Sequence, residues 1–177
     1  TMYILLRLIM LNTCEWSTPD PKDHSSAVWN PTEIFQDKAK AYFASGCFWC
    51  VESVYESVKG VEEAYSGYAG GKTKNPTYYQ VITGGTGHAE TVEVIYDPAV
   101  VDFATVVKVF FDSHDPTLLN QQGPDRGTQY RSIAFYQNDE EKKNIEDYIA
   151  QLTEAKIYNR SIVTEVKSLS KFYYAEN

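Results

Sequence analysis

The alternation of hydrophobic and polar residues predicts strands and helices in turn along the chain from about residue 40 onward. Ala89–Tyr96 alternates with period two, and this strand is expected to end at Asp97-Pro98 because proline cannot continue a hydrogen-bond ladder. Three other short runs are also typical of strands: 41–44, 132–136 and 162–166.

Three further segments place hydrophobic residues at helical spacing and carry start or stop signals. The first begins at Cys47 and is closed by Gly60. The second is capped by Asp102, and the third by Asn138, which has Glu141 at the capping-box position. Glycine and Asn-Pro clusters predict loops between these elements, at 67–76, 84–87 and 115–129.

Strands and helices that alternate without a nucleotide-type glycine loop predict an α+β fold. We expect a two-layer sandwich, with a ferredoxin-like mixed sheet and helices packed on it. The 177 residues fit one domain. Residues 12–33 are polar and hold three of the seven prolines, so residues 1–39 are expected to form an extension with little regular structure. Residues 40–177 are expected to form a single folded domain.

Composition and charge narrow the class of partner. The formal net charge of −8 argues against nucleic acid and anionic lipid, which attract basic patches, so no nucleic-acid partner is expected. The apolar run at 3–11 is far shorter than the roughly 20 residues that span a bilayer, so no membrane span is expected. A cytoplasmic location is the prediction, with export through this run as the alternative.

The three cysteines, Cys14, Cys47 and Cys50, are too few for the disulfide framework of a small secreted protein. Cys47 falls at a predicted helix start, where unpaired N–H groups favour a thiolate and lower the thiol pKa. This placement predicts a nucleophile. The alternative is that Cys47 is a small buried hydrophobic residue.

Cys50 lies about one helical turn after Cys47, which suggests a redox pair. A zinc site would need more ligands, and the remaining candidates, His24, His88 and His114, have no paired spacing, so no metal is expected. A general thiol-disulfide oxidoreductase stays open as an alternative, because such enzymes also use two cysteines separated by two residues.

Glu90 is the candidate proton donor. By strand parity it shares the apolar face of Val92 and Val94, where burial would raise its carboxyl pKa. A solvated carboxylate at a strand edge is the alternative. His88 points to the opposite face by the same parity and is expected to be structural, and His114 is expected to pack or to cap a helix end.

Seven short motifs, in order, resemble those of the peptide methionine-(S)-sulfoxide reductases of the A type. They are Gly-Cys-Phe-Trp at 46–49, Gly-Tyr at 67–68 before Gly-Gly at 70–71, Asn-Pro-Thr-Tyr at 75–78, Gly-His-Ala-Glu at 87–90, His-Asp-Pro at 114–116, Gly-Thr-Gln-Tyr-Arg-Ser at 127–132 and Phe-Tyr-Tyr-Ala-Glu at 172–176. One motif would be weak evidence, but seven in order are specific.

The resemblance implies reduction of the S epimer of methionine sulfoxide, both free and in oxidised proteins, as a repair activity after oxidative damage. Cys47 would attack the sulfur, and Glu90 would protonate the departing oxygen. Tyr78 and Tyr130 would donate hydrogen bonds to that oxygen. Asp125 would hold the surrounding network.

The resemblance also places Phe48 and Trp49 around the methyl group of the substrate. The resulting sulfenic acid on Cys47 would condense with a second thiol. Many relatives carry glycine at the position of Cys50 and resolve with C-terminal cysteines, whereas no cysteine follows Cys50 here, so Cys50 and Cys14 both stay open as resolving thiols. No bound cofactor is implied, and thioredoxin would be the external reductant. A non-catalytic protein that binds oxidised methionine is a third reading.

Overall fold

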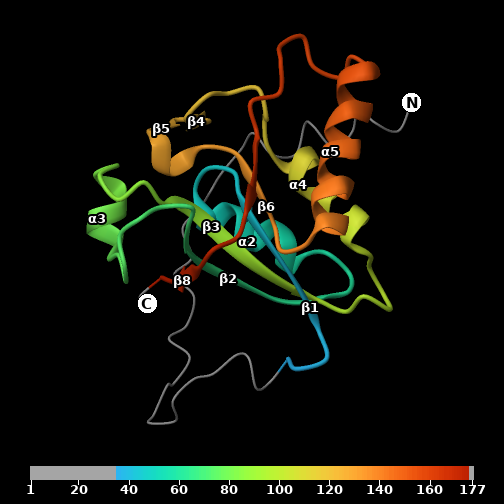
Figure 1. Cartoon of the computed structure of the whole chain (residues 1–177), viewed down its shortest axis with the longest axis horizontal. Coiled ribbons are helices and arrows are strands. Elements are labelled where there is room, and N and C mark those ends of the chain that lie inside the picture. The colour runs from blue at the N-terminus through green and yellow to red at the C-terminus, as the bar shows by residue number, and fades with distance from the viewer. Residues whose placement is uncertain (1–34, 176–177) are drawn as a thin grey trace. The chain divides into compact units, whose positions relative to one another are not determined.

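The computed structural model describes residues 35–175 and is built around one mixed sheet (Figure 1). The strand order is β7-β6-β1-β3-β2-β8, with antiparallel neighbours except for the parallel pair β6 and β7. The strands are β1 (Ala39–Ala44), β2 (Val61–Ala69), β3 (Ala89–Tyr96), β6 (Ile133–Tyr136), β7 (Glu165–Ser168) and β8 (Phe172–Tyr174). A separate two-stranded hairpin consists of β4 (Gln121–Gln122) and β5 (Asp125–Arg126).

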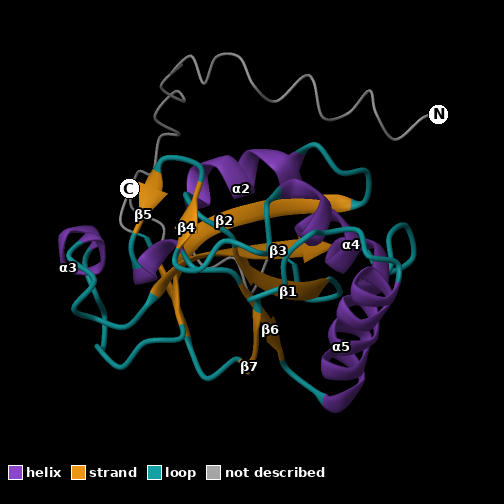
Figure 2. Ribbon diagram, turned by 90° about the horizontal axis from the view of Figure 1, so that it is seen from above, coloured by secondary structure: helices purple, strands orange, loops and turns teal. Residues whose placement is uncertain are grey.

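Helices pack on this sheet, as Figure 2 shows from a second direction: α2 (Phe48–Glu56), α4 (Phe103–Ser113) and α5 (Asp139–Glu154). The short helix α3 (Tyr78–Ile82) lies to one side of the sheet, and a 3₁₀ turn η1 (Thr128–Tyr130) precedes β6. The Phe43 ring of β1 stacks on Phe110 of α4 at 4.9 Å and on Tyr55 of α2 at 5.7 Å, so one hydrophobic layer joins both helices to the sheet. The predicted α+β fold with a mixed sheet is confirmed.

Several elements agree with the sequence pattern. The strand Ala89–Tyr96 has the predicted bounds. The caps of α4 and α5 are formed as expected: Asp102 Oδ1 accepts the Thr105 N–H at 2.8 Å, and Asn138 Oδ1 accepts the Glu141 N–H at 2.9 Å.

Other elements differ from the pattern. The loop predicted at 67–76 begins inside strand β2, which the pattern missed. Gly67 lies inside this strand because β8 comes so close that only glycine fits: a Cβ at this position would lie 2.3 Å from the Tyr173 carbonyl oxygen. The strand predicted at 162–166 exists but lies three residues later, at Glu165–Ser168 (β7), and it is not the last strand, because β8 follows it. The exposed edge strand β7 has too little burial to mark its position by hydrophobicity.

Short elements also occupy segments that the pattern left as loops. The segment 115–129 contains β4, β5 and the start of η1. The segment 77–82, for which the pattern predicted no element, contains α3. Most of the predicted extension, including Cys14 and the apolar run at 3–11, lies outside the described residues. No helix in the described part of the chain is long and apolar enough to cross a membrane.

Candidate active site

Cys47 lies at the N-cap of α2, directly after the turn that leaves β1. Its carbonyl oxygen accepts the Cys50 N–H at 3.1 Å, which begins the helix. The thiol is half-buried, whereas Cys50 is exposed on the first turn. The predicted helix start at the cysteine is therefore correct to within one residue.

Gly46 allows this turn for two reasons. Its φ of +96° lies in the left-handed region, which side chains disfavour, and a Cβ would lie 2.6 Å from Cβ of Gln122 in the β4–β5 hairpin. The chain can therefore pass beneath the hairpin and present Cys47 only with glycine at this position.

Replacement of Gly46 by alanine should lower the free energy of unfolding by roughly 1 to 3 kcal/mol or more, because backbone strain and a steric clash act together. Urea denaturation measures this. Gly123→Ala is the matched control, because Gly123 also has positive φ, +54°, but nothing lies within 4 Å of its Cβ position. Equal losses for the two variants would contradict the clash with Gln122.

Glu90 is the second residue of β3, and its side chain is only 2% exposed. Its Oε2 atom accepts the backbone N–H of Phe48 at 3.0 Å, which places the carboxyl group beside the residue that follows Cys47. Burial raises the Glu90 pKa to about 7, with a smaller contribution from the charge of Asp125, while the Phe48 N–H lowers it. Both protonation states are therefore populated near neutral pH.

The thiol of Cys47 departs from the sequence expectation of a lowered pKa. Burial raises its pKa to about 12, and the backbone N–H groups of Cys50 and Trp49 offset this only in part. The charges of Cys50 and Glu90 raise it further. The expected lowering of the pKa by the helix start is thus wrong in direction, because desolvation outweighs the N–H groups, and the Cys47 thiol is neutral near pH 7.

Two tyrosines from different elements lie within electrostatic reach of Glu90, Cys47 and Asp125. Tyr78 opens α3, and Tyr130 ends η1; the Gln129 side chain fixes these elements to each other by donating to the Ile82 carbonyl oxygen at 3.0 Å. Burial is the largest cause that raises both tyrosine pKa values, that of Tyr130 to about 12, and the charge of Glu90 raises them further. Both phenols are therefore neutral hydrogen-bond donors at neutral pH.

Asp125 enters the site from strand β5, where it pairs with Gln122 across the hairpin. Its charge contributes to the raised pKa values of Glu90, Tyr78 and Tyr130, so it lies within electrostatic reach of all three. The structure thus brings Asp125 to the site residues that the sequence motifs singled out.

Aromatic rings form a wall beside Cys47. The buried Phe48 ring lies 5.1 Å from Trp49 and 6.4 Å from Tyr78, and Trp49 lies 5.9 Å from Tyr78. The ring of Tyr68 in β2, a residue that the sequence did not single out, contacts the Phe48 ring at 5.7 Å. Tyr68 lies in the Gly-Tyr motif at 67–68, so the motif could have marked it as a site residue, whereas its hydropathy could not.

The histidines His88 and His114 are not part of the site. His88 Nδ1 accepts the Gly71 N–H at 3.1 Å, so Nε2 carries the proton and donates to the Thr73 carbonyl oxygen at 2.8 Å. His114 ends α4 and contacts the Phe110 carbonyl oxygen at 2.7 Å through Nδ1. Both roles are structural. Among residues 35–175, no three His, Cys, Asp or Glu side chains form a group that could hold a metal ion.

A thiol beside a protonatable carboxyl group and two phenol donors is the arrangement of a thiol-dependent oxidoreductase. Comparisons with known proteins make this class specific. The model of the family "Peptide methionine sulfoxide reductase" matches residues 39–177. The chain therefore belongs to the peptide methionine sulfoxide reductase family, and the predicted enzyme class is confirmed.

Individual relatives agree. Peptide methionine sulfoxide reductase MsrA of Natronomonas pharaonis is 52% identical over 138 residues, which cover 78% of each chain. MsrA of Methanosarcina mazei is 42% identical over 181 residues, covering 100% of this chain and 85% of that protein. Among solved structures, reduced Mxr1 from Saccharomyces cerevisiae is 30% identical with a TM-score of 0.74, covering 84% of this chain and 83% of that one.

Proposed function

We propose that the chain reduces the S epimer of methionine sulfoxide, free and in peptides, with Cys47 as nucleophile and Glu90 as proton donor. The observation that carries this proposal is the contact between the Glu90 carboxyl group and the Phe48 N–H at 3.0 Å, beside Cys47. With a pKa raised to about 7, the carboxyl group can both give and regain a proton near neutral pH.

In the proposed step, the sulfur of Cys47 bonds to the sulfur of the sulfoxide, and the sulfoxide oxygen takes up a proton from Glu90. The thiol proton of Cys47 leaves and can restore the Glu90 carboxyl group. Transfer of the OH group to Cys47 then releases methionine and leaves Cys47 as a sulfenic acid. The substrate sulfur is reduced and the cysteine sulfur is oxidised, so atoms and electrons balance.

The remaining site residues hold the substrate. Tyr78 and Tyr130 would donate hydrogen bonds to the sulfoxide oxygen, which suits neutral phenols with raised pKa values. Asp125 would orient this polar side of the site. Phe48 and Trp49 would contact the methyl group, because their rings lie 5.1 Å apart and form an apolar surface next to Cys47.

Recycling would use Cys50 as the resolving thiol. Its attack on the sulfenic acid of Cys47 forms the disulfide and releases water, and an external dithiol then reduces the disulfide. The exposed position of Cys50, one helical turn away, supports this choice over Cys14. Thioredoxin is the proposed reductant. A solved complex of Mxr1 with Trx2 has the same fold, at 22% identity and a TM-score of 0.58.

A cytoplasmic location and one catalytic domain at 40–177 belong to the same proposal. Thiols that need continual reduction suit a reducing compartment. The match of the family to residues 39–177 supports the domain limits.

Replacement of Cys50 by serine should leave a single turnover intact but stop thioredoxin-dependent cycling, because the sulfenic acid on Cys47 then lacks its neighbouring thiol. Rapid-quench measurement of methionine formed per protein checks the first part, and NADPH oxidation coupled through thioredoxin reductase checks the second. Undiminished cycling in this variant would assign the resolving role to another thiol, and Cys14→Ser in the same background would identify it.

Separated epimers test the proposed function directly. A peptide with the S epimer of methionine sulfoxide should be reduced in the presence of dithiothreitol, while the R epimer should not. The same protein should not accelerate the reduction of insulin disulfides by dithiothreitol above its uncatalysed rate. Rapid insulin reduction without sulfoxide reduction would instead support a general disulfide oxidoreductase.

A further inference from the structure

The aromatic wall of the site continues outward to Tyr79 of α3. The Tyr79 ring lies 5.9 Å from Tyr78 at an interplanar angle of 71°, an edge-to-face contact. Tyr78 in turn contacts Trp49 and Phe48. The four rings therefore form a continuous series from the buried base of the site to its surface.

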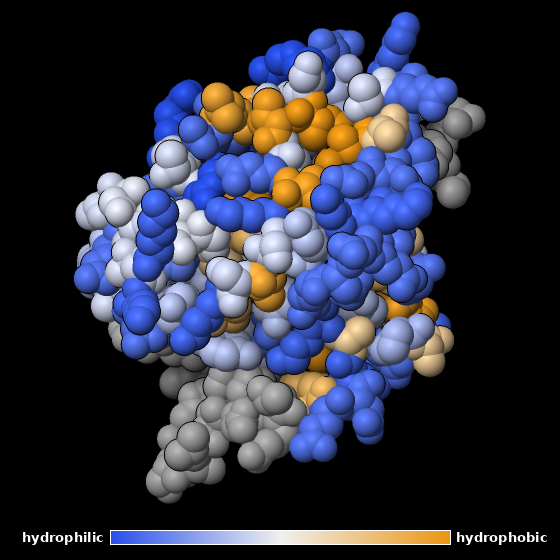
Figure 3. Space-filling model, viewed as in Figure 1, coloured by the Kyte–Doolittle hydropathy of each residue, from blue (hydrophilic) through white to orange (hydrophobic). Residues whose placement is uncertain are grey.

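Exposure rises from Phe48, which is 1% exposed, through the half-buried Tyr78 to Tyr79, which is 78% exposed. Trp49, which also contacts Tyr78, is 54% exposed. Tyr79 is thus a large aromatic side chain that is exposed to solvent and contacts the Tyr78 ring of the site. In Figure 3 the region around α3 is pale and blue, so this surface does not stand out as hydrophobic.

Local structure holds Tyr79 in place. The capping box of α3 joins Thr77 and Gln80 on both sides of it: the Gln80 side chain accepts the Thr77 N–H at 3.0 Å, and the Thr77 hydroxyl accepts the Gln80 N–H at 3.4 Å. The 3₁₀ turn η1 holds the far end of the helix through Gln129 and the Ile82 carbonyl oxygen. The ring is therefore presented on a short but fixed element.

We propose that Tyr79, with the exposed part of Trp49, is a docking subsite for an apolar or aromatic side chain next to the oxidised methionine in a polypeptide substrate. This inference rests on the proposed function. A side chain one or two positions along an extended peptide is displaced by about 3.3 to 7 Å from the methionine, comparable with one ring-to-ring step in the series. An aromatic neighbour would then bury the Tyr79 ring.

The molecule that would occupy this subsite is a polypeptide substrate, because the surface of Tyr79 is continuous with the site. A polypeptide whose methionine sulfoxide lies against Phe48 can leave the site along the aromatic rings, because Tyr78 and Tyr79 continue from Phe48 to the surface. Segments rich in hydrophobic residues are exposed in damaged proteins, and these rings offer them a matching surface. The subsite would therefore favour oxidised methionines that were buried before damage.

The test compares peptides that differ only in the residue beside the S epimer of methionine sulfoxide: phenylalanine, leucine, serine or glutamate. For the wild-type chain, kcat/KM for the phenylalanine peptide should exceed that for the serine peptide roughly threefold to tenfold, mainly through KM. Tyr79→Ala should remove this difference, whereas Tyr79→Phe should retain it. Activity on free methionine sulfoxide should be unchanged in both variants.

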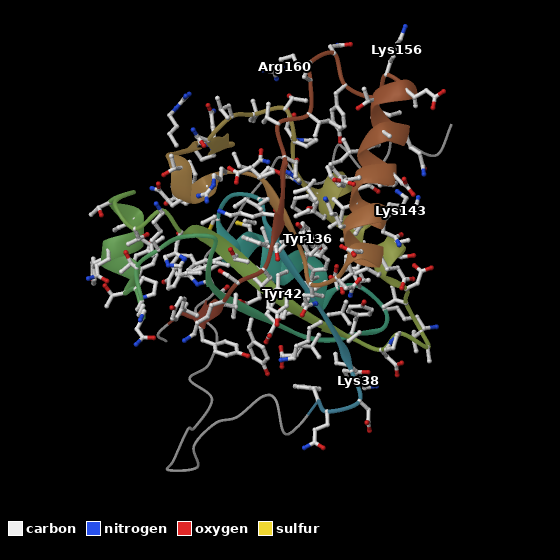
Figure 4. The ribbon with its side chains drawn as sticks, in the orientation of Figure 1. Lys38, Tyr42, Tyr136, Lys143, Lys156 and Arg160 are labelled. Carbon is white, nitrogen blue, oxygen red and sulfur yellow. The ribbon has the colours of Figure 1, made fainter. Side chains whose placement is uncertain are left out.

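Ile157→Ala is the control for loss of an exposed apolar side chain, since Ile157 is 56% exposed. It follows Lys156, which lies beyond α5 on the opposite side of the molecule from α3 (Figures 1 and 4). The control should keep the full preference.

A preference for phenylalanine that persists in Tyr79→Ala would overturn the inference, as would an equal loss on free methionine sulfoxide. A wild-type chain that reduces all four peptides with equal kcat/KM would also overturn it while leaving the proposed function intact. A chain that reduces no sulfoxide at all would refute the proposed function itself.

Discussion

Cys47→Ser should abolish all measurable reduction of methionine sulfoxide, including a single turnover. A serine oxygen cannot form the sulfur–sulfur bond of the proposed step, and it cannot store the transferred oxygen as a sulfenic acid. The change is nearly isosteric at a half-buried helix cap, so the fold should persist, and serine is itself a good N-cap residue. Steady-state and rapid-quench assays, with circular dichroism to check folding, measure this effect.

Cys50→Ser is the matched control for this loss, because it removes a thiol on the same helical turn. It should still form methionine once per protein molecule. Retained turnover in Cys47→Ser would remove Cys47 from the chemistry, and loss of the single turnover in both variants would indicate that either change disturbs the helix start.

Glu90→Gln should lower kcat/KM by roughly 10² to 10⁴-fold, the usual contribution of a positioned proton donor. The amide can still accept the Phe48 N–H, so the geometry at the helix start should survive while proton transfer is lost. The assay is sulfoxide reduction with saturating dithiothreitol, which removes any dependence on thioredoxin. A variant with wild-type kcat/KM would exclude Glu90 as the acid.

The pH profile gives the same residue a second signature. Glu90 has a raised pKa, about 7, and the proposed step needs its protonated form when substrate binds. The protonated fraction is complete well below pH 7 and falls as the pH rises through this value, so kcat/KM should fall over the same range. In Glu90→Gln, this descending limb near pH 7 should disappear.

Glu93→Gln provides a control on the same strand. Glu93 is also 2% exposed, but it accepts the hydroxyls of Tyr42 at 2.6 Å and Tyr174 at 2.7 Å and pairs with Lys40 at 3.0 Å. By strand parity it points away from the face of Glu90. Its replacement should reduce stability but leave the limb near pH 7 in place.

The sequence predicted the parts of the fold that depend on burial and capping. The strand of Glu90, the helix start at Cys47 and the capped helices α4 and α5 all have strong local signals. Strand β2 was missed because Gly67 resembles a loop residue until the close approach of Tyr173 is known. The short hairpin β4–β5 has too few residues for any periodicity to form.

The sequence motifs named the members of the candidate site, and their roles stay predictions, but the motifs did not predict the electrostatics of the site. Motifs named Cys47, Glu90 and the two tyrosines, and the structure brings them together. The thiol pKa could not be predicted, because it depends on how deeply the fold buries the helix start. Gln122, which fixes Gly46 from a distant hairpin, had no signal in the local sequence.

The central claim is that Cys47 takes the oxygen from the substrate, and peptide mass spectrometry tests it most directly. The reduced protein is mixed with one equivalent of the S epimer of methionine sulfoxide, without reductant, and its cysteine peptides are mapped. The account predicts one methionine released per protein and a disulfide between Cys47 and Cys50, replaced in Cys50→Ser by a trappable sulfenic acid on Cys47. Methionine formed while Cys47 stays an unmodified thiol would contradict it.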